Sequence, residues 1–252
     1  MAELPSVEAI ERAGLLTWPA LETEADGNWL RRAAAGYTKR ANCVQCLDLN
    51  DGDNARERLA AAANWFKARQ LPPVFRVTPL TAPAVVEALE AGGGLPFDQS
   101  DVLAMPLETG KFPVAPLVDF PRPTEAIWVR VQRALHNYDN AAFSALVGII
   151  GKLEVPSRGV VVRNADGEPL ASALVAIAGS IAITVNVVTV ATVRRRGHGR
   201  MVMQGALAWA AMNGARFAVV QVLAENAAAK ALYEGLGFTR QYGYNYFRIG
   251  TL

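Results

Sequence analysis

Apolar positions along the chain follow one order of predicted elements, and that order occurs twice. Each half shows a helix with apolar residues every three or four positions, a short buried strand, a second helix and a last strand. In the N-terminal half these elements are predicted around residues 59–66, 73–78, 81–93 and 101–107. In the C-terminal half they are predicted around residues 201–209, 217–223, 226–237 and 242–249. From the first helix to the phenylalanine after the second helix, the spacing is 38 residues in one half and 37 in the other, which predicts a duplicated α/β unit.

The chain between the two copies is rich in proline, which lacks a backbone donor and resists regular structure. Residues 108–125 are therefore predicted to link a domain of residues 1–107 to a domain of residues 126–252. The elements predicted after the linker are a strand at 124–134, a helix at 140–150 and a meander of strands at 158–190 with a turn at 165–167. A β-rich sheet that leads into a helix predicts a mixed α/β fold of the α+β type, without regular alternation of strands and helices.

Length, composition and charge limit the functions to consider. At 252 residues, 52% of them hydrophobic, the chain can bury the cores of two domains. The 25 basic and 23 acidic residues give a formal charge of +2, which excludes a generally basic protein that coats nucleic acid. Ser180 and Asn186 interrupt the longest apolar run before it reaches the ~18 residues of a membrane helix, and no signal peptide is evident. We expect a cytoplasmic monomer or homodimer without a nucleic-acid or membrane partner.

Cys43 and Cys46 form a C-x-x-C pair, but the chain offers few other ligands for a metal. No second pair follows, and the only histidines are His136 and His198. A four-ligand zinc site therefore cannot be assembled locally, and no metal is predicted. The segment around the pair has the pattern of a strand, which would point the two thiols to opposite faces and argues against a redox pair. Both cysteines are predicted to be packing residues.

The segment from Val193 to Arg200, VRRRGHGR, concentrates four arginines where a strand is predicted to turn into a helix. The start of a helix carries unpaired backbone N–H groups and the positive end of the helix dipole, so it attracts anions. Gly197 and Gly199 allow the backbone to approach a ligand, and the arginines can reach further phosphates. The lysine and hydroxyl residue of a Walker loop are missing, and Val202 stands where a dinucleotide fingerprint needs its third glycine. The sequence predicts an anion site of another kind.

Two motifs in this half resemble those of the GCN5-related N-acetyltransferase (GNAT) superfamily. Arg194, Gly197 and Gly199 match its R/Q-x-x-G-x-G/A pyrophosphate loop. Residues 226–238, NAAAKALYEGLGF, match its N-x-x-A-x-x-L-Y-x-x-x-G-F segment. The opening of the chain is similar to bacterial tandem-domain members with a degenerate N-terminal copy. The resemblance implies two GNAT-like domains, each a twisted, mostly antiparallel sheet flanked by helices, with residues 126–252 as the catalytic domain.

The resemblance also implies a cosubstrate, a mechanism and the residues that carry it. Acetyl-CoA would donate its acetyl group to an amine of a small molecule or of a protein. Tyr233 would act as a general acid that protonates the departing thiolate, and Asn226 would position the pantetheine arm. The residues implied to bind the rest of coenzyme A are Val187, Val188 and Thr189 through their backbone and Arg194, Arg195, Arg196, Gly197, His198, Gly199 and Arg200 at the pyrophosphate.

Several residues leave the chemistry open. Relatives that acetylate the N-terminal alanine of a ribosomal protein have a glutamate base where this chain has Gln221, so the base is unassigned. Glu225, Glu234 or a water chain could serve, and an amine with a lowered pKa needs no base. Tyr233 could instead be a packing aromatic residue, and Asn226 a plain helix cap. The alternative to an N-acetyltransferase is a non-catalytic coenzyme A binder that acts as a sensor or in assembly.

The N-terminal copy has the opposite charge at the matching place. Asp48, Asp51 and Asp53 stand where the other half has arginines, and acidic residues there would repel a pyrophosphate. A matching tyrosine is missing as well. This half is therefore predicted to shape the acceptor side. Residues 26–42, which mix aromatic and cationic side chains, are expected to form either a wall of that pocket or a solvated strand pair.

Overall fold

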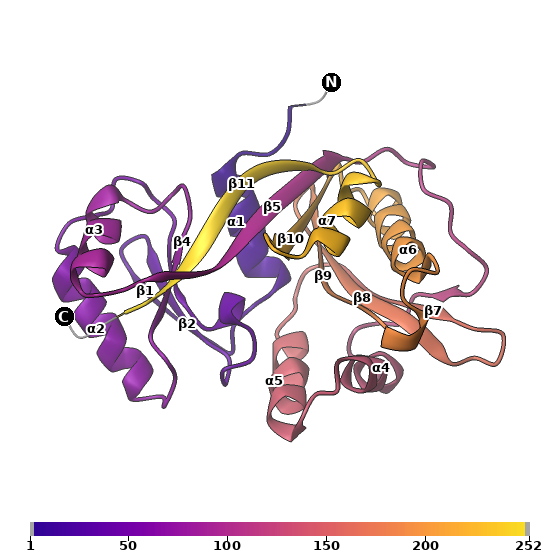
Figure 1. Cartoon of the computed structure of the whole chain (residues 1–252), viewed down its shortest axis with the longest axis horizontal. Coiled ribbons are helices and arrows are strands. Elements are labelled where there is room, and N and C mark those ends of the chain that lie inside the picture. The colour runs from indigo at the N-terminus through magenta and orange to yellow at the C-terminus, as the bar shows by residue number, and fades with distance from the viewer. Residues whose placement is uncertain (1–2, 250–252) are drawn as a thin grey trace.

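The computed structural model describes residues 3–249, which form two lobes around one sheet (Figure 1). The helices are α1 (Val7–Thr17), α2 (Ala55–Lys67), α3 (Pro83–Ala91), α4 (Ala126–His136), α5 (Asn140–Gly151), α6 (His198–Met212) and α7 (Ala227–Glu234), with short 3-10 helices η1 (Lys39–Ala41) and η2 (Ala191–Val193). The strands are β1 (Glu22–Asp26), β2 (Trp29–Ala33), β3 (Val44–Cys46), β4 (Val74–Val77), β5 (Pro96–Pro106), β6 (Val118–Asp119), β7 (Ser157–Arg163), β8 (Pro169–Ala178), β9 (Ile181–Thr189), β10 (Phe217–Leu223) and β11 (Thr239–Arg248). None of the helices in this part of the chain is both long and apolar enough to cross a membrane.

The strands join in one sheet, in the order β1-β2-β3-β4-β11-β5-β10-β9-β8-β7-β6. Neighbouring strands are antiparallel except for two pairs, β3 with β4 and β9 with β10. A helix crosses between the members of each parallel pair, α2 in the first and α6 in the second, as a parallel connection requires. The predicted fold class, mixed α/β with a mostly antiparallel sheet, is confirmed, and its repeated unit is visible in the topology.

The two halves exchange their last strands. β5 closes the N-terminal half but pairs with β10, while β11 closes the C-terminal half but pairs with β4. The two exchanged strands also pair with each other at the centre of the sheet, and Figure 1 shows them crossing from one lobe to the other. The sheet is therefore continuous through the chain. The division into residues 1–107, 108–125 and 126–252 stays a prediction.

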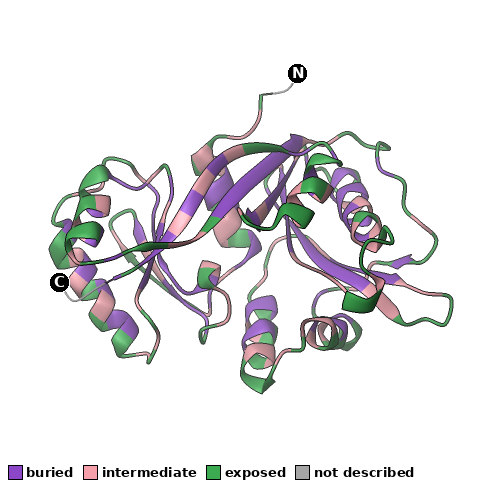
Figure 2. Ribbon diagram, in the orientation of Figure 1, coloured by how far each residue is buried: buried purple, intermediate pink, exposed green. Residues whose placement is uncertain are grey.

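Buried apolar side chains form three clusters on the two faces of this sheet. Figure 2 shows that the buried residues concentrate in the central strands. One cluster lies under α2 and α3 and contains Trp29, Phe66 and Phe75. A second lies under α6 and includes Tyr233 and Phe238. The third joins residues of α1, α4 and α5, and α1 packs on β8 and β9 of the other half. The N-terminal helix therefore covers the sheet at β8 and β9.

The prediction of a strand at residues 124–134 is wrong, because this segment forms α4. Trp128, Val131 and Gln132 are buried, whereas Ile127 is 49% exposed. The buried positions follow the spacing of one helix face. Two valines that alternate with polar residues inside the segment resemble a strand pattern, but this alternation is too short to distinguish a strand from a helix. The other predicted helices and strands are present at their predicted places.

Both cysteines are free and fully buried, in two different apolar clusters. Cys43 packs in the cluster under α1, and Cys46 packs in the cluster under α2. Burial raises the pKa of the Cys43 thiol to about 11, so it is a poor nucleophile at neutral pH. Their predicted role as packing residues on opposite faces is confirmed.

Candidate active site

β9 and β10 run in parallel and then separate. Their pairing ends at Thr184 and Val220, although both strands continue beyond this point. On their outer sides the strands keep their partners, β8 for β9 and β5 for β10. The inner backbone edges therefore lie open to a ligand in the described chain. Val187, Val188 and Thr189 are half-buried along the open part of β9, which leaves their backbone available for a ligand that continues the sheet.

Asn186 forms a bulge in β9 at the start of the split. Its φ is +52°, and the register against β8 shifts between Ser172 and Leu174. The Asn186 side chain donates from Nδ2 to the Tyr37 hydroxyl (3.1 Å). That hydroxyl lies 2.6 Å from the hydroxyl of Tyr138, which stands between α4 and α5. Side chains from both halves of the chain thus meet at the bulge.

This contact decides part of the interpretation of residues 26–42. Tyr37 reaches the split, as the wall interpretation expects. Trp29 does not, because it is fully buried against Phe75 in the N-terminal lobe. The beginning of the segment does form a strand pair with β1, but its own strand, β2, is largely buried and not solvated.

The start of α6 presents a row of free backbone donors. Gly197 precedes the helix with a φ of +87°, and Arg195 is also left-handed with a φ of +63°. Throughout the described chain, no backbone N–H from Arg195 to Arg200 has an acceptor. The first one bonded is that of Met201, which donates to the Gly197 carbonyl (3.0 Å). A Cβ built on Gly197 would meet nothing within 4 Å, so the space in front of these donors is open.

The side chains around this helix start are cationic and mostly unpaired. Arg194–Arg196 are exposed and form no ion pair with any residue that the structure describes. Arg200 instead donates to the Gly235 carbonyl (3.2 Å) after α7. Nδ1 of His198 is enclosed and finds no partner within residues 3–249. Positive charge and free donors therefore converge without an intramolecular anion to balance them.

Three elements meet at Gly199, near the end of the open β9 edge. A Cβ added there would lie 3.3 Å from Leu232 of α7 and 3.6 Å from the Thr189 hydroxyl of β9. A side chain at this position would press on Leu232, so glycine favours this close approach of α6. The structure therefore brings together the predicted loop, the predicted strand residues and α7, which lie apart in the sequence.

Tyr233 and Asn226 occupy the two ends of α7. Asn226 caps the helix, and its Oδ1 accepts from the Ala229 N–H (3.1 Å), so its side chain does what the plain-cap alternative expects. Tyr233 is 6% exposed, and its ring packs edge-on against Phe238 at 5.9 Å. Its hydroxyl makes no hydrogen bond to a described residue, yet it is not among the fully enclosed unpartnered atoms. The ring is therefore a packing group, while the hydroxyl faces accessible space.

Burial also determines the acidity of Tyr233. It raises the pKa of the phenol to about 12, and the positive charge of Arg40 acts in the opposite direction. The hydroxyl therefore keeps its proton at neutral pH. A group with a free, protonated hydroxyl beside the split is able to donate a proton to a bound ligand.

The loop before α2, at the matching place in the N-terminal half, holds a fixed carboxylate. α2 also follows a left-handed residue, Asn54, with a φ of +52°. The Asp51 carboxylate near this helix start accepts from the Asn28 N–H (2.7 Å) and from Arg58 Nη1 (2.6 Å). The hydrogen bond from Arg58 lowers the pKa of Asp51, so the group is an anion at neutral pH. The repeat therefore keeps a left-handed residue before its helix, but its loop carries a fixed carboxylate where the other loop carries unpaired arginines.

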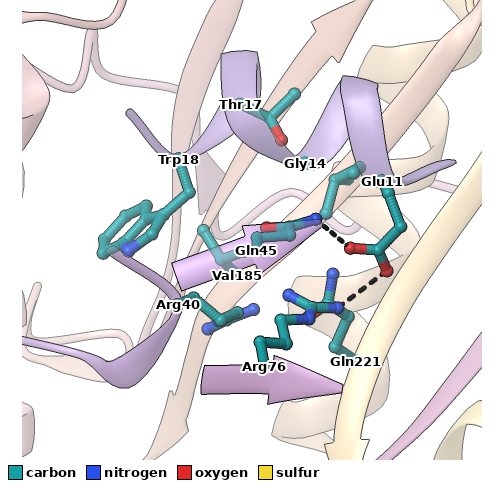
Figure 3. Close-up of a pocket in the computed structure, with 10 residues that line it drawn as sticks. Glu11, Gly14, Thr17, Trp18, Arg40, Gln45, Arg76, Val185 and Gln221 are labelled. Carbon is teal, nitrogen blue, oxygen red and sulfur yellow. Dashed lines mark hydrogen bonds and ion pairs between the residues drawn. The ribbon is translucent and has the colours of Figure 1, made fainter. Parts of the chain in front are cut away.

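Gln221 is the first residue of β10 after its pairing with β9 ends. It lines a small cavity under α1 (Figure 3). Its Oε1 accepts from the Tyr244 hydroxyl (3.2 Å). Glu11 of α1 lines the same cavity, is 2% exposed, and accepts hydrogen bonds from Gln45, Arg76 and Tyr242. Glu11 is therefore fully engaged. The other two carboxylates considered from the sequence are exposed: Glu225 before α7 and Glu234 at its end.

Sequence patterns do not single out Glu11 or Tyr138, and they mark Tyr37 and Arg40 only as part of a mixed aromatic and cationic stretch. Tyr37 and Tyr138 are 101 positions apart, so only the fold brings them together. No group of three or more histidine, cysteine or acidic side chains in the described residues is arranged to hold a metal ion.

Comparison with solved structures shows which proteins share this fold. A GCN5-related N-acetyltransferase from Kribbella flavida has the same fold over 99% of this chain and 98% of its own, with a TM-score of 0.73 and 17% identity. A tandem GNAT protein from the clavulanic acid biosynthesis pathway covers 100% of this chain and 90% of its own, with a TM-score of 0.66 and 12% identity. The chain therefore has the fold of these two proteins.

The family of the chain follows from the sequence comparison. Residues 5–247 match the family described as "Probable histone acetyltransferase Rv0428c C-terminal", and the chain belongs to that family. The uncharacterized N-acetyltransferase YobR of Bacillus subtilis (strain 168) is 24% identical over 246 residues, which cover 94% of this chain and 96% of YobR. The predicted membership of the GNAT superfamily is confirmed, and the chain is an acetyltransferase of that superfamily.

Proposed function

We propose that the chain is an acetyl-CoA-dependent N-acetyltransferase whose acceptor is an amine of a small molecule or of a protein. The observation that carries the proposal is the row of free backbone donors from Arg195 to Arg200, beside the split between β9 and β10. A diphosphate needs many donors and positive charge, and a pantetheine arm needs an open strand edge. Residues that fit both parts of coenzyme A converge at Gly199.

In this proposal each part of the site has one task. The N–H groups from Arg195 to Arg200 hold the diphosphate, and Arg194–Arg196 reach its outer oxygens. The backbone of Val187–Thr189 holds the extended arm, so that the thioester reaches the Asn186 bulge. Bound acetyl-CoA supplies an activated acetyl group. Tyr233 gives its phenolic proton to the sulfur as the carbon–sulfur bond breaks, and it regains a proton from solvent.

The proton of the acceptor amine leaves without a dedicated carboxylate. Gln221 accepts no proton, and Glu11 already receives three hydrogen bonds. Glu225 and Glu234 are exposed, so in this proposal they offer the amine no better proton acceptor than water does. We propose that the amine attacks in its neutral form and that water removes its extra proton.

A transfer assay tests this function. The protein is incubated with acetyl-CoA and a panel of amines that includes amino acids, polyamines, and peptides with free N-termini or lysines, and acetylated products are detected by mass spectrometry. The proposal expects one equivalent of free thiol for each acetylated amine. Coenzyme A binding without transfer to any amine supports the non-catalytic sensor instead, for which the engaged Gln221 is the structural argument.

We predict that one chain binds one coenzyme A. The loop before α6 carries exposed arginines, whereas the loop before α2 holds the Asp51 carboxylate. An added diphosphate there would meet a fixed negative charge. Calorimetric titration should give a stoichiometry near one, and a value near two would show that the N-terminal copy also binds the nucleotide.

We predict that the acid limb of the pH–rate profile follows the acceptor and not the enzyme. Because no enzyme base is assigned, kcat/KM should rise with pH until the pKa of the acceptor amine is reached. Burial raises the pKa of Tyr233 to about 12, so its loss of a proton should not reduce kcat until the pH approaches that value. Profiles for two acceptors with different amine pKa values test this. The same acid-side break for both acceptors would reveal a base on the enzyme.

A further inference from the structure

Positive side chains outnumber carboxylates where the N-terminal lobe meets the split. Arg32, Arg40 and Arg76 gather there, and the cavity between the lobes is lined by a single carboxylate, that of Glu11 (Figure 3). Arg76 uses that carboxylate in a 2.8 Å ion pair, with both side chains less than 5% exposed. A nearby acidic residue, Asp98, is paired with Lys39 (2.5 Å). Two guanidinium groups therefore remain without a carboxylate among the described residues.

The two remaining arginines differ in what surrounds them. Arg32 is 4% exposed and donates to two carbonyls, those of Arg40 and Trp18, at 2.6 Å each. It is satisfied as a donor and is sealed from ligands. Its bond to the Arg40 carbonyl also fixes the backbone of η1, so the position of the Arg40 side chain has a rigid base.

Arg40 has no such partners. Its guanidinium makes no hydrogen bond or ion pair within residues 3–249, and none of its nitrogens is among the enclosed unpartnered atoms. The side chain is half-buried and lines the cavity beside Val185 and Gln221, where the open edges of β9 and β10 begin. In Figure 3 the Arg40 side chain lies near Trp18, the residue after α1, and beside Arg76 of β4. Arg40 is thus accessible, unpaired and close to the split.

Neighbouring tyrosines show how far the Arg40 charge reaches. Burial raises the pKa of Tyr37, Tyr138 and Tyr233, and the charge of Arg40 opposes this rise in each case. Tyr37 and Tyr138 lie at the Asn186 bulge, and Tyr233 lies on α7. Arg40 lines the cavity with Val185, which precedes the Asn186 bulge, so it lies near the place where an acceptor would approach a thioester bound in the split. The cavity behind it holds only about 10 Å³, room for about one water, so a ligand would meet Arg40 at the mouth.

We propose that Arg40 binds a carboxylate of the acceptor, so that the substrate is an amine that carries an anionic group near the nitrogen. This inference rests on the proposed acetyltransferase function and narrows its substrate class. A guanidinium binds a carboxylate through two parallel hydrogen bonds, which fixes both distance and direction. The anion would also balance the excess positive charge at the junction. The N-terminal half thereby takes part in substrate choice without binding coenzyme A.

The test compares acceptors that differ only in a carboxylate or a carboxamide. Amino acids and their primary amides form one set, and short peptides with aspartate or asparagine at the N-terminus form another, which separates small acceptors from peptide acceptors. The measured quantity is the ratio of kcat/KM for acid and amide, compared between wild type and Arg40→Gln. Because each ratio is compared across enzymes, differences in amine pKa between acid and amide cancel.

We expect Arg40→Gln to reduce kcat/KM for the acid by roughly 10- to 100-fold, mainly through KM, and to leave the amide nearly unchanged. Arg40→Lys should restore part of the preference, because it keeps the charge but not the fork. The matched control is Lys39→Gln in the same short helix, whose charge is already paired with Asp98 and should not affect the ratio. Coenzyme A affinity and melting temperature should stay at wild-type values in all three variants.

The outcomes separate the two proposals. An equal loss for acid and amide in Arg40→Gln, or a wild-type preference for amines without a carboxylate, overturns the inference and leaves the acetyltransferase function intact. Absence of product from every amine overturns the function, and the inference with it. Calorimetric binding of the N-acetylated acid to the coenzyme A complex gives a second readout, and equal binding to wild type and Arg40→Gln also overturns the inference.

Discussion

Replacing Gly197 with aspartate is expected to abolish coenzyme A binding while leaving the fold intact. Gly197 has a φ of +87°, which aspartate adopts at modest cost, and a Cβ there meets nothing within 4 Å. The new carboxylate would stand among the donors from Arg195 to Arg200. At about 4 Å from a phosphate charge it would cost about 4 kcal/mol at an effective dielectric constant near 20, or about 10³-fold in affinity. Calorimetry with coenzyme A measures the loss.

Gly197→Asn is the matched control, since asparagine has the same shape, tolerates the same φ and carries no charge. It should weaken binding far less than aspartate does. Circular dichroism and melting temperature must show that both variants are folded. If the folded aspartate variant keeps wild-type affinity, the start of α6 is not the diphosphate site.

Tyr233→Phe should give the second large effect, a loss of roughly 10²- to 10⁴-fold in kcat. The ring is buried against Phe238, and its hydroxyl makes no hydrogen bond with the described residues, so removing the oxygen leaves no partner unsatisfied. Melting temperature and coenzyme A affinity should therefore stay nearly unchanged. Steady-state kinetics on the acceptor identified by the transfer assay provides the measurement.

A thiolate can leave without being protonated, and a phenol with a pKa of about 12 is a weak acid. These two facts set an upper limit on the loss of kcat in Tyr233→Phe. Phe238→Leu offers a control, because it disturbs the same packing without touching the hydroxyl. Wild-type turnover in Tyr233→Phe would assign the residue to packing alone. Equal loss of kcat in Phe238→Leu would show that packing, and not the proton, explains the result.

Local patterns predict most of the elements of this fold, because helices and buried strands leave periodic apolar positions. They fail at residues 124–134, where two valines that alternate with polar residues suggest a strand. The structure shows a helix there, whose buried face includes Trp128. They also do not predict that β5 and β11 exchange places. Both strands have the same pattern in either half, and the choice of partner depends on edges formed far away in the sequence.

Only part of the candidate site can likewise be predicted from the sequence. The loop around Gly197 and the segment from Asn226 to Tyr233 are continuous in sequence, so their motifs can be read directly. The proposed acceptor side contains Tyr37, Arg40 and Tyr138, which have no common motif and come together only because α1 packs on β8 and β9 and Tyr37 contacts Tyr138. Their role is a question of charge and contact that spacing alone cannot answer.

The sequence predicts acidic residues before α2 where the other copy has arginines, and the structure shows what one of these acidic residues contacts. A left-handed residue precedes both α2 and α6, so the backbone of the loop is repeated. In the first copy the Asp51 carboxylate is held by Arg58 and by the Asn28 N–H. A repeat can thus keep the backbone shape of its loop while the charge of that loop disfavours an anionic ligand.

The central claim is that one acetyl-CoA lies in the split between β9 and β10 with its diphosphate at the start of α6. A crystal structure of the chain with acetyl-CoA tests it most directly. We predict that the diphosphate lies within hydrogen-bonding distance of the N–H groups from Arg195 to Arg200, and that the arm runs along Val187–Thr189. The sulfur should then be within reach of the Tyr233 hydroxyl. Nucleotide bound at the start of α2, or bound away from the split, would contradict the account.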